Sequence, residues 1–214
     1  PVVQEVNRDQ VPSPRIHPAV RIHAGPAPLS GEAFFEDWPS FLGYGHDAVS
    51  SETQLLKKWP EDGPVVVWEL EKGEGYATPS IAGARLVFIH REGDTEKIEC
   101  LHPESGKLYW RFQYPTGYRD RFGYGKGPRA SPVIEGRYVY VLGAEGRLNC
   151  LDIATGQLCW SRSLADEFRI PQGFFGWATS PVVDGGNLII NLGVPGGPCV
   201  VAFDKTSGRL VWGT

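Results

Sequence analysis

The fold is decided by the stretch CLDIATGQLCW, which occupies residues 150–160. Two related stretches occur, CLHPESGKLYW at 100–110 and AFDKTSGRLVW at 202–212. Each contains a glycine followed four residues later by a tryptophan: Gly106 and Trp110, Gly156 and Trp160, Gly208 and Trp212. A fixed period of about fifty residues indicates a chain built from structural repeats.

The repeat extends upstream of this signature. Before each copy stand YATPSIAGARLVFIH (76–90), RASPVIEGRYVYVLG (129–143) and WATSPVVDGGNLIINLG (177–193). A Thr or Ser precedes a proline in all three, and Pro79, Pro132 and Pro181 lie 53 and 49 residues apart. A glycine-containing turn and an apolar run follow, as in a hairpin.

These patterns predict four short strands per repeat. We expect them at 78–82, 85–90, 96–102 and 107–113; at 131–135, 137–142, 146–151 and 157–162; and at 180–184, 187–192, 198–204 and 209–213. Four antiparallel strands repeated about every fifty residues are typical of a β-propeller blade. The sequence therefore predicts an all-β propeller, present as about three blades.

Composition supports this class and excludes others. The 214 residues include 27 glycines and 18 prolines, which suit short strands joined by turns and argue against a helical protein. The formal charge of -4, with scattered basic residues, argues against a nucleic-acid partner. No apolar run approaches the roughly 20 residues of a membrane span.

Cysteine and histidine show no spacing that indicates chemistry. The four cysteines form no C-x-x-C pair, so we expect no metal site. Cys150 and Cys159 flank one hairpin, either as a cross-strand disulfide or as two core thiols. No two of the five histidines are spaced as ligands, and His46 and His90 are expected on the surface. No catalytic triad or phosphate-binding loop is present, so no catalytic residue is assigned.

The segments before the repeats differ in character. Residues 1–33 are rich in proline and are expected to form an extended arm or linker. Residues 34–64 begin with FFEDWPSFLG, which is apolar enough to dock on the body, and 50–60 could form a short helical turn. GPVVVWEL (63–70) predicts a strand over 65–70, and its Trp68 resembles the last strand of a repeat.

The repeated signature resembles the tryptophan-docking motif of pyrroloquinoline-quinone-like (PQQ-like) propeller repeats over residues 65–213. The resemblance implies blades at 71–116, 128–165 and 177–214, with 65–70 as a strand that closes a last blade absent from this sequence. It also implies structural roles for Gly106, Trp110, Asp152, Gly156, Trp160, Asp204, Gly208 and Trp212. His102 stands where the motif has aspartate, which puts one turn hydrogen bond in doubt.

Two functions follow from this resemblance. The first is a non-catalytic scaffold or binding module for a protein or peptide, similar to the outer-membrane-assembly propellers and placed in the periplasm or cell envelope, with no cofactor. The second is a fragment of a quinoprotein dehydrogenase that uses PQQ and calcium to oxidise alcohols or sugars. The adjacent cysteine pair of many such dehydrogenases is missing here. Further blades are expected in a longer parent chain.

A binding surface is expected where loops enter the innermost strands. The loops at 72–76, 122–129 and 170–177 carry aromatic and cationic residues beside glycines, and they should converge near the propeller axis. The candidate residues of this axial face are Tyr76, Tyr124, Lys126, Arg129, Phe175 and Trp177. The alternative interpretation is that Arg129 pairs within the propeller and the aromatic rings only seal its channel.

Overall fold

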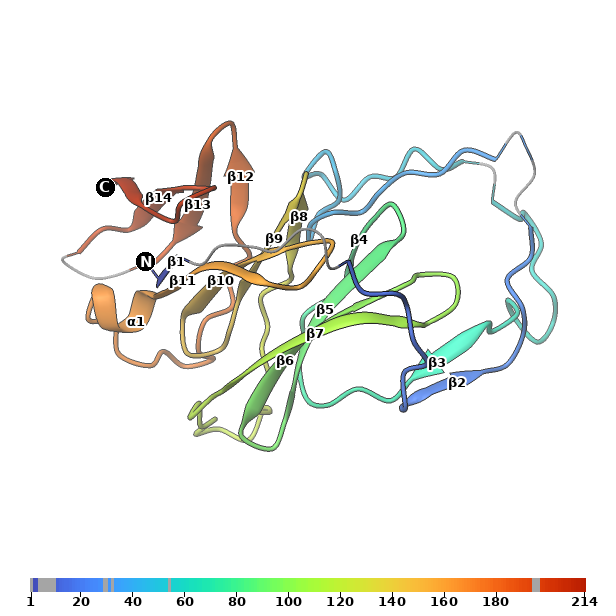
Figure 1. Cartoon of the computed structure of the whole chain (residues 1–214), viewed down its shortest axis with the longest axis horizontal. Coiled ribbons are helices and arrows are strands. Elements are labelled where there is room, and N and C mark those ends of the chain that lie inside the picture. The colour runs from blue at the N-terminus through green and yellow to red at the C-terminus, as the bar shows by residue number, and fades with distance from the viewer. Residues whose placement is uncertain (1, 4–10, 29–30, 32, 54, 194–196) are drawn as a thin grey trace.

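The chain folds into small antiparallel sheets that stand side by side (Figure 1). The computed structural model describes residues 2–3, 11–28, 31, 33–53, 55–193 and 197–214. Blade 1 contains β4 (Ser80–Ala82), β5 (Arg85–Glu92), β6 (Thr95–Leu101) and β7 (Leu108–Pro115). Blade 2 contains β8 (Val133–Glu135), β9 (Tyr138–Leu142), β10 (Arg147–Asp152) and β11 (Leu158–Ser163). Blade 3 contains β12 (Val182–Asp184), β13 (Asn187–Asn191), β14 (Val200–Asp204) and β15 (Leu210–Gly213).

The predicted all-β propeller of four-stranded antiparallel blades is confirmed. Within each blade the strands follow one another in chain order, and the first strands of successive blades contact one another. These first strands, β4, β8 and β12, therefore lie nearest the axis of the arc. The one helix among the described residues is α1 (Leu164–Glu167), a single turn after β11.

Three tryptophans pack against the repeat glycine of the next sheet. A Cβ placed on Gly106, Gly156 or Gly208 would meet the ring of Trp68, Trp110 or Trp160, respectively, within about 3 Å. The indole nitrogens donate to backbone carbonyls three residues before those glycines, at Pro103 (2.8 Å), Ile153 (2.9 Å) and Lys205 (3.1 Å). One contact, used three times, thus joins consecutive sheets.

The turn before each repeat glycine is stabilised by an aspartate side chain in blades 2 and 3 and by backbone bonds in blade 1. Asp204 accepts bonds from the hydroxyl and the amide of Ser207, and these bonds and those from Thr206 lower the pKa of Asp204 to about 2. Asp152 caps its own turn through Thr155. Blade 1 has His102 at this position, and backbone bonds close the turn: the amide of Gly106 donates to the carbonyl of His102 (2.9 Å), and the amide of His102 donates to the carbonyl of Lys107 (2.8 Å).

The N-terminal arm pairs with the outer strands of blades 1 and 2 and forms a separate two-stranded sheet with β3. β1 (Val2–Val3) pairs with β11, and Arg15 exchanges two backbone bonds with Leu108 of β7 (2.9 and 2.8 Å). β2 (Val20–Ile22) pairs with β3 (Trp68–Leu70), which appears where the closing strand was expected. The arm was predicted as an extended linker, and these pairings show that it protects exposed strand edges.

A buried carboxylate fastens this arm to blade 1. Glu99 of β6 accepts hydrogen bonds from Nε2 of His17 (3.2 Å), from Nε2 of His90 (3.2 Å) and from Nε of Arg111. Burial alone would raise the pKa of Glu99, but the bonds from His90, Arg111 and His17 outweigh it and lower the pKa to about 2.

The two histidines of this cluster are held in one orientation. Nδ1 of His17 accepts the amide of Ala19 (3.1 Å), and Nδ1 of His90 accepts the amide of Gly73 (2.8 Å). In each ring Nε2 therefore faces Glu99. The expectation that His90 lies on the surface is wrong: its side chain is buried because the carboxylate and the backbone satisfy both nitrogens.

The predicted helical turn at 50–60 is also wrong. The described residues of that segment form no helix. Ser51 instead donates from its amide (3.1 Å) and hydroxyl (2.8 Å) to the carboxylate of Glu36, and Glu52 accepts the amide of Glu36 (2.7 Å). These bonds hold the backbone of the segment in an extended conformation and compete with the backbone hydrogen bonds of a helix.

The question left open for Cys150 and Cys159 is answered by the structure. No disulfide joins them, and both side chains are buried in the core that blades 2 and 3 share. Burial, followed by the hydrogen bond with Cys159, raises the pKa of the Cys150 thiol well above its ordinary value. These cysteines serve as small core residues.

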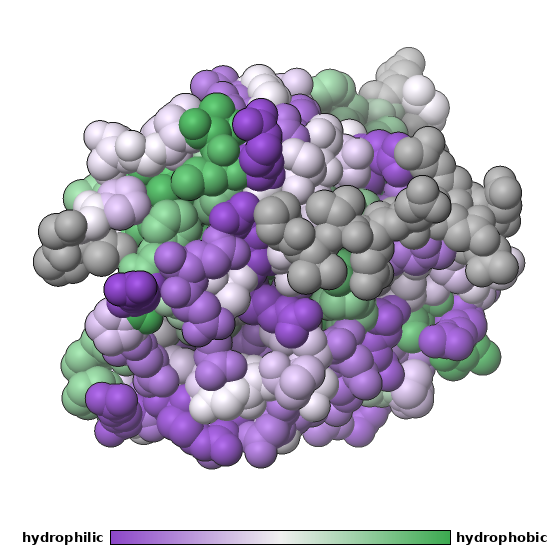
Figure 2. All heavy atoms as spheres, turned by 60° about the vertical axis from the view of Figure 1, so that its left-hand side comes forward, coloured by the Kyte–Doolittle hydropathy of each residue, from purple (hydrophilic) through white to green (hydrophobic). Residues whose placement is uncertain are grey.

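Blade 3 differs from the other blades in its exposed outer strand. Leu210, Val211 and Trp212 of β15 keep 40%, 48% and 41% of their surface accessible. In Figure 2 the side that carries blade 3 comes forward, and apolar residues gather there among hydrophilic ones. The described residues place no glycine partner against Trp212, in contrast to Trp68, Trp110 and Trp160.

Candidate functional site

The inner strands are joined by hydroxyl groups of the Thr/Ser-Pro motif. Oγ of Ser131 accepts the amide of Thr78 (3.1 Å), and the amide of Ser131 donates to Oγ of Ser180 (2.9 Å). Ser80 also donates to the carbonyl of Pro132 (2.6 Å). The motif therefore holds the entrances to β4, β8 and β12 at a fixed separation, which positions the loops before them.

Three of those loops bring aromatic rings together around one arginine. The guanidinium carbon of Arg129 lies 5.3 Å from the ring centre of Tyr76 and 5.3 Å from that of Phe175. The Tyr124 ring meets Phe175 edge-on at 5.5 Å, and the Tyr76 hydroxyl donates to the carbonyl of Tyr124. Four of the predicted axial residues thus form one group.

Two further rings belong to this group and were not predicted. Phe122 and Phe174 stack with their centres 3.8 Å apart, and Phe174 contacts Phe175 at 4.5 Å. We call the whole set the axial cluster: Tyr76, Phe122, Tyr124, Arg129, Phe174 and Phe175. Both missed residues stand in the loops already singled out, so their aromatic character was an available signal.

The structure places the other two predicted residues differently. Lys126 is exposed, and its backbone is fixed by bonds from its amide to Glu74 (2.9 Å) and from Arg91 to its carbonyl (3.2 Å). Trp177 lies against the turn of blade 2: a Cβ on Gly146 would come within 2.5 Å of its ring. Trp177 packs with the core between blades 2 and 3 instead of joining the axial cluster.

The guanidinium of Arg129 donates its hydrogen bonds to uncharged groups. Its guanidinium donates to the carbonyls of Phe175 (3.0 Å), Gly125 (3.2 Å) and Gly127 (3.3 Å). No described carboxylate forms an ion pair with it. Asp120 lies near Arg129: desolvation raises the pKa of Asp120, but bonds from the amides of Phe122 and Gly125, and the charge of Arg129, lower it. The cluster therefore combines a fixed cation with apolar rings.

A second part of the axial face is a cavity beside Arg129. The segment 34–64 runs along the inner edges: Trp38 exchanges two backbone bonds of 2.9 Å with Ile81, and the carbonyl of Pro39 accepts the amide of Ile134 (2.8 Å). Beyond them lies a cavity of about 270 Å³, which we call the axial cavity. Its lining is Ser40, Phe41, Leu42, His46, Arg129, Ala178, Ser180, Pro181 and Val182.

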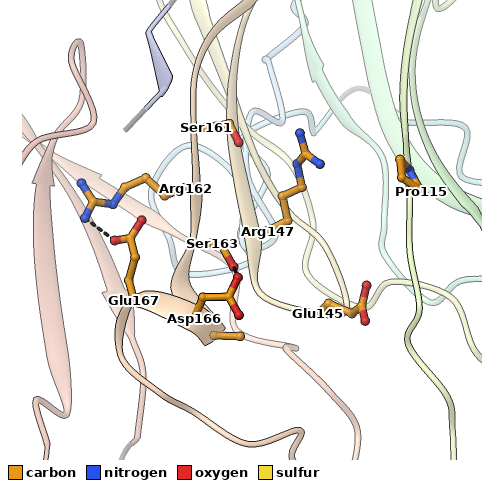
Figure 3. A pocket seen from close by; sticks show the side chains of 9 residues that line it. Pro115, Glu145, Arg147, Ser161, Arg162, Ser163, Asp166 and Glu167 are labelled. Carbon is orange, nitrogen blue, oxygen red and sulfur yellow. Dashed lines mark hydrogen bonds and ion pairs between the residues drawn. The ribbon is translucent and has the colours of Figure 1, made fainter.

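A larger cavity, of about 690 Å³, lies at the rim near α1 and is lined mainly by polar residues (Figure 3). Its charged groups are already partnered: Arg162 pairs with Glu167, Ser163 donates to Asp166 (2.5 Å), and Glu145 accepts the amide of Gly117 (2.7 Å). Because these three acidic side chains already have partners in the chain, the rim cavity has the features of a solvated boundary between blades 1 and 2.

The described residues do not by themselves make a PQQ–calcium site. Within that part of the chain, no three His, Cys, Asp or Glu side chains are grouped to hold a metal ion. The axial cluster offers aromatic rings and a cation, whereas calcium needs several oxygen ligands. In the described part of the chain no helix is long and apolar enough to cross a membrane.

The chain is similar to several known proteins. It is 24% identical over 175 residues to the outer membrane protein assembly factor BamB of Yersinia pestis, and this match covers 77% of the chain and 39% of that protein. The BamB structure from Moraxella catarrhalis aligns with 24% identity and a TM-score of 0.48 over 68% of the chain and 41% of that structure. The quinohemoprotein alcohol dehydrogenase of Comamonas testosteroni aligns with 21% identity and a TM-score of 0.48, over 66% of the chain and 21% of that structure.

The match to a family model covers residues 94–213, which is more than half of the chain. This region contains β6 and β7 of blade 1 and all of blades 2 and 3, including the three Gly and Trp signatures from which the propeller was predicted. The chain spans 39% of the length of its Yersinia pestis relative. It belongs to the family of PQQ-like propeller repeat proteins described as outer membrane protein assembly factor BamB.

Proposed function

We propose that the chain is a non-catalytic binding module of an envelope propeller, and that its axial cluster contacts a protein partner during outer membrane protein assembly. The observation that carries this proposal is the exposure of the cluster. Tyr76, Tyr124 and Phe174 keep 64%, 55% and 51% of their surface accessible, although the Tyr124 and Phe174 rings contact each other and Arg129 lies over the Tyr76 ring.

An exposed group of this kind is suited to protein recognition. Contiguous exposed aromatic surface in a soluble protein commonly marks an interaction site. Tyrosine and arginine are enriched among residues that dominate binding energy, because they bury a large area and still offer hydrogen bonds. The loops that carry these residues rest on rigid blades, so a partner would meet a surface that is already formed.

The family supports the cellular setting of this proposal. The relatives' name, outer membrane protein assembly factor, suggests the cell envelope as the compartment and the assembly machinery as the source of the partner. The aromatic rings and the cation of the axial cluster suit a protein partner better than calcium, which needs several oxygen ligands.

The test is a binding measurement between the full chain and purified outer membrane assembly machinery. Replacing Tyr124 and Phe175 by alanine should weaken binding by tenfold or more, because the two rings meet at the centre of the cluster. A matched control replaces Leu55 and Leu56, which are exposed to a similar extent but lie outside the cluster. Equal binding by both double variants would disprove the proposal.

A further inference from the structure

The inner edge of each blade presents one residue in an equivalent position. Ile81, Ile134 and Val183 each stand two residues after the proline of the repeat. Each is also the middle residue of a three-residue inner strand and pairs across a tight hairpin, with Leu86, Val139 and Leu188, respectively. In this register the N–H and C=O groups of the middle residue point away from the hairpin partner, toward the axis.

In blades 1 and 2 the chain itself occupies this edge. Trp38 bonds to both backbone groups of Ile81, and Pro39 accepts the amide of Ile134. The segment therefore adds an extended piece of backbone to two neighbouring sheets. This arrangement is β-strand addition within one molecule.

In blade 3 the equivalent edge is open. The described residues provide no backbone partner for the N–H or C=O of Val183 on its axial side. The axial cavity lies beside this edge, since Pro181 and Val182 of the same stretch line it together with Phe41 and Leu42. Val182 keeps 43% of its surface accessible and Phe41 keeps 54%.

We propose that β12 accepts an extended, acidic and aromatic segment of a protein partner at Val183. This inference rests on the proposed function and names the class of partner segment that the axial face takes. The partner's backbone would bond to Val183, an apolar side chain would enter the axial cavity, and a carboxylate would approach Arg129. Arg129 forms no ion pair with a described carboxylate, although Asp120 lies near enough to feel its charge, so the carboxylate of a partner can still pair directly with the guanidinium.

The chain's own segment shows which side chains suit such an edge. The sequence around Trp38 is EDWP, at residues 36–39. Asp37 accepts the amide of Gly83 (2.7 Å) in the hairpin turn of blade 1. Gly185 occupies the same place in blade 3, with a φ of 56° compared with 52° at Gly83. In the partner, an acidic residue just before the residue that bonds to Val183 can therefore accept the amide of Gly185 in the same way.

The experiment uses the full chain and a fluorescein-labelled peptide that copies residues 34–41, FFEDWPSF, with a free carboxyl terminus. We expect saturable binding by fluorescence anisotropy that weakens with salt. Methylating the peptide nitrogen that corresponds to Trp38 removes the donor to the strand edge and should weaken binding about tenfold. Methylating the nitrogen that corresponds to Asp37, which points away from β12 in this register, should change affinity less than about threefold.

Matched protein variants locate the contact. Val183→Pro removes the edge N–H and should weaken the peptide about tenfold, whereas Val183→Ala keeps the N–H and should bind it nearly normally. If Val183→Pro does not fold, the two methylated peptides still test the proposal with the unchanged protein. Equal affinity of the two methylated peptides overturns the proposal, and so does a dimer of the chain that covers Val183 and excludes the peptide.

The outcomes also separate this inference from the proposed function. If the Tyr124 and Phe175 double variant loses the assembly partner while the peptide shows no dependence on its backbone nitrogens, strand addition is wrong and the axial cluster remains a binding site. If the full chain binds neither the assembly partner nor the peptide, both proposals fail.

Discussion

Trp110 and Gly156 meet so closely between blades 1 and 2 that a Cβ on Gly156 would lie 2.5 Å from the indole ring. Gly156 also has a φ of 72°, a conformation that side chains disfavour. The glycine of the repeat is thus required for two separate reasons, the turn itself and the approach of the neighbouring blade. Both reasons can be tested separately, because other glycines in the chain share only the first.

Gly156→Ala should destabilise the chain by more than about 3 kcal/mol, since a strained backbone and a clash with a packed ring add together. Gly136→Ala is the matched control: Gly136 has a φ of 57°, but a Cβ there meets nothing within 4 Å. The control should lose only about 1 kcal/mol, from the backbone alone. Urea unfolding of both variants measures the difference, and equal losses would show that the tryptophan contact contributes nothing.

Acid should weaken the attachment of the N-terminal arm through Glu99. Because the folded state lowers the pKa of Glu99 from 4.5 to about 2, its stabilising effect is present above pH 4.5 and is lost as the pH falls toward 2. The full effect is on the order of 3 kcal/mol. Unfolding experiments between pH 6 and pH 3 should show this slope in the unchanged chain and a smaller slope in Glu99→Gln.

The control for Glu99 is an exposed pair of the same kind. Glu69 contacts His23 at 2.9 Å, but the two side chains keep 59% and 44% of their surface accessible. Glu69→Gln should change the unfolding free energy by less than about 1 kcal/mol, because solvent screens exposed pairs. A slope in Glu99→Gln as steep as in the unchanged chain would contradict the assignment to Glu99.

The hydroxyl bridge between inner strands should also contribute to stability. Ser131→Ala removes the acceptor for the amide of Thr78, and the expected loss is about 1 kcal/mol. Ser50→Ala removes a comparable bond to the amide of Glu52 in an exposed turn, and its effect should stay within about 0.5 kcal/mol. Thermal unfolding of the two variants makes the comparison, and a harmless Ser131→Ala would show that the motif does not join the blades.

The repeats were predictable because their signals are local. The spacing from Gly156 to Trp160, the turn at Gly136 and the alternating apolar residues all act within one hairpin, so the sequence indicates blades and strand positions to within about two residues. The axial cluster was partly predictable for a related reason. Tyr76, Arg129 and Phe175 stand just before inner strands, and repeat topology brings such positions together.

What could not be predicted depends on contacts between distant segments. Nothing near His17 in the sequence indicates that Glu99, 82 residues away, will bury it. The pairing of Trp38 with Ile81 likewise needs the assembled inner edge before it exists. The packing of Trp177 against the turn at Gly146 is a further contact that the sequence around Trp177 does not indicate. Local sequence patterns do not indicate which distant segments come into contact.

The reaction rates of the four cysteine thiols should show which of them are buried in the core. Cys199 is exposed, whereas Cys100, Cys150 and Cys159 are buried. Burial raises the pKa of Cys100 to about 12, so its reactive thiolate is scarce at pH 8, and burial also raises that of Cys150. A thiol-specific reagent at pH 8 should therefore modify one cysteine quickly in the folded chain and four after unfolding in urea. Cys199→Ser should abolish the fast reaction while leaving three slow thiols, and a second fast thiol in the folded chain would mean that the core between the blades opens more readily than its packing indicates.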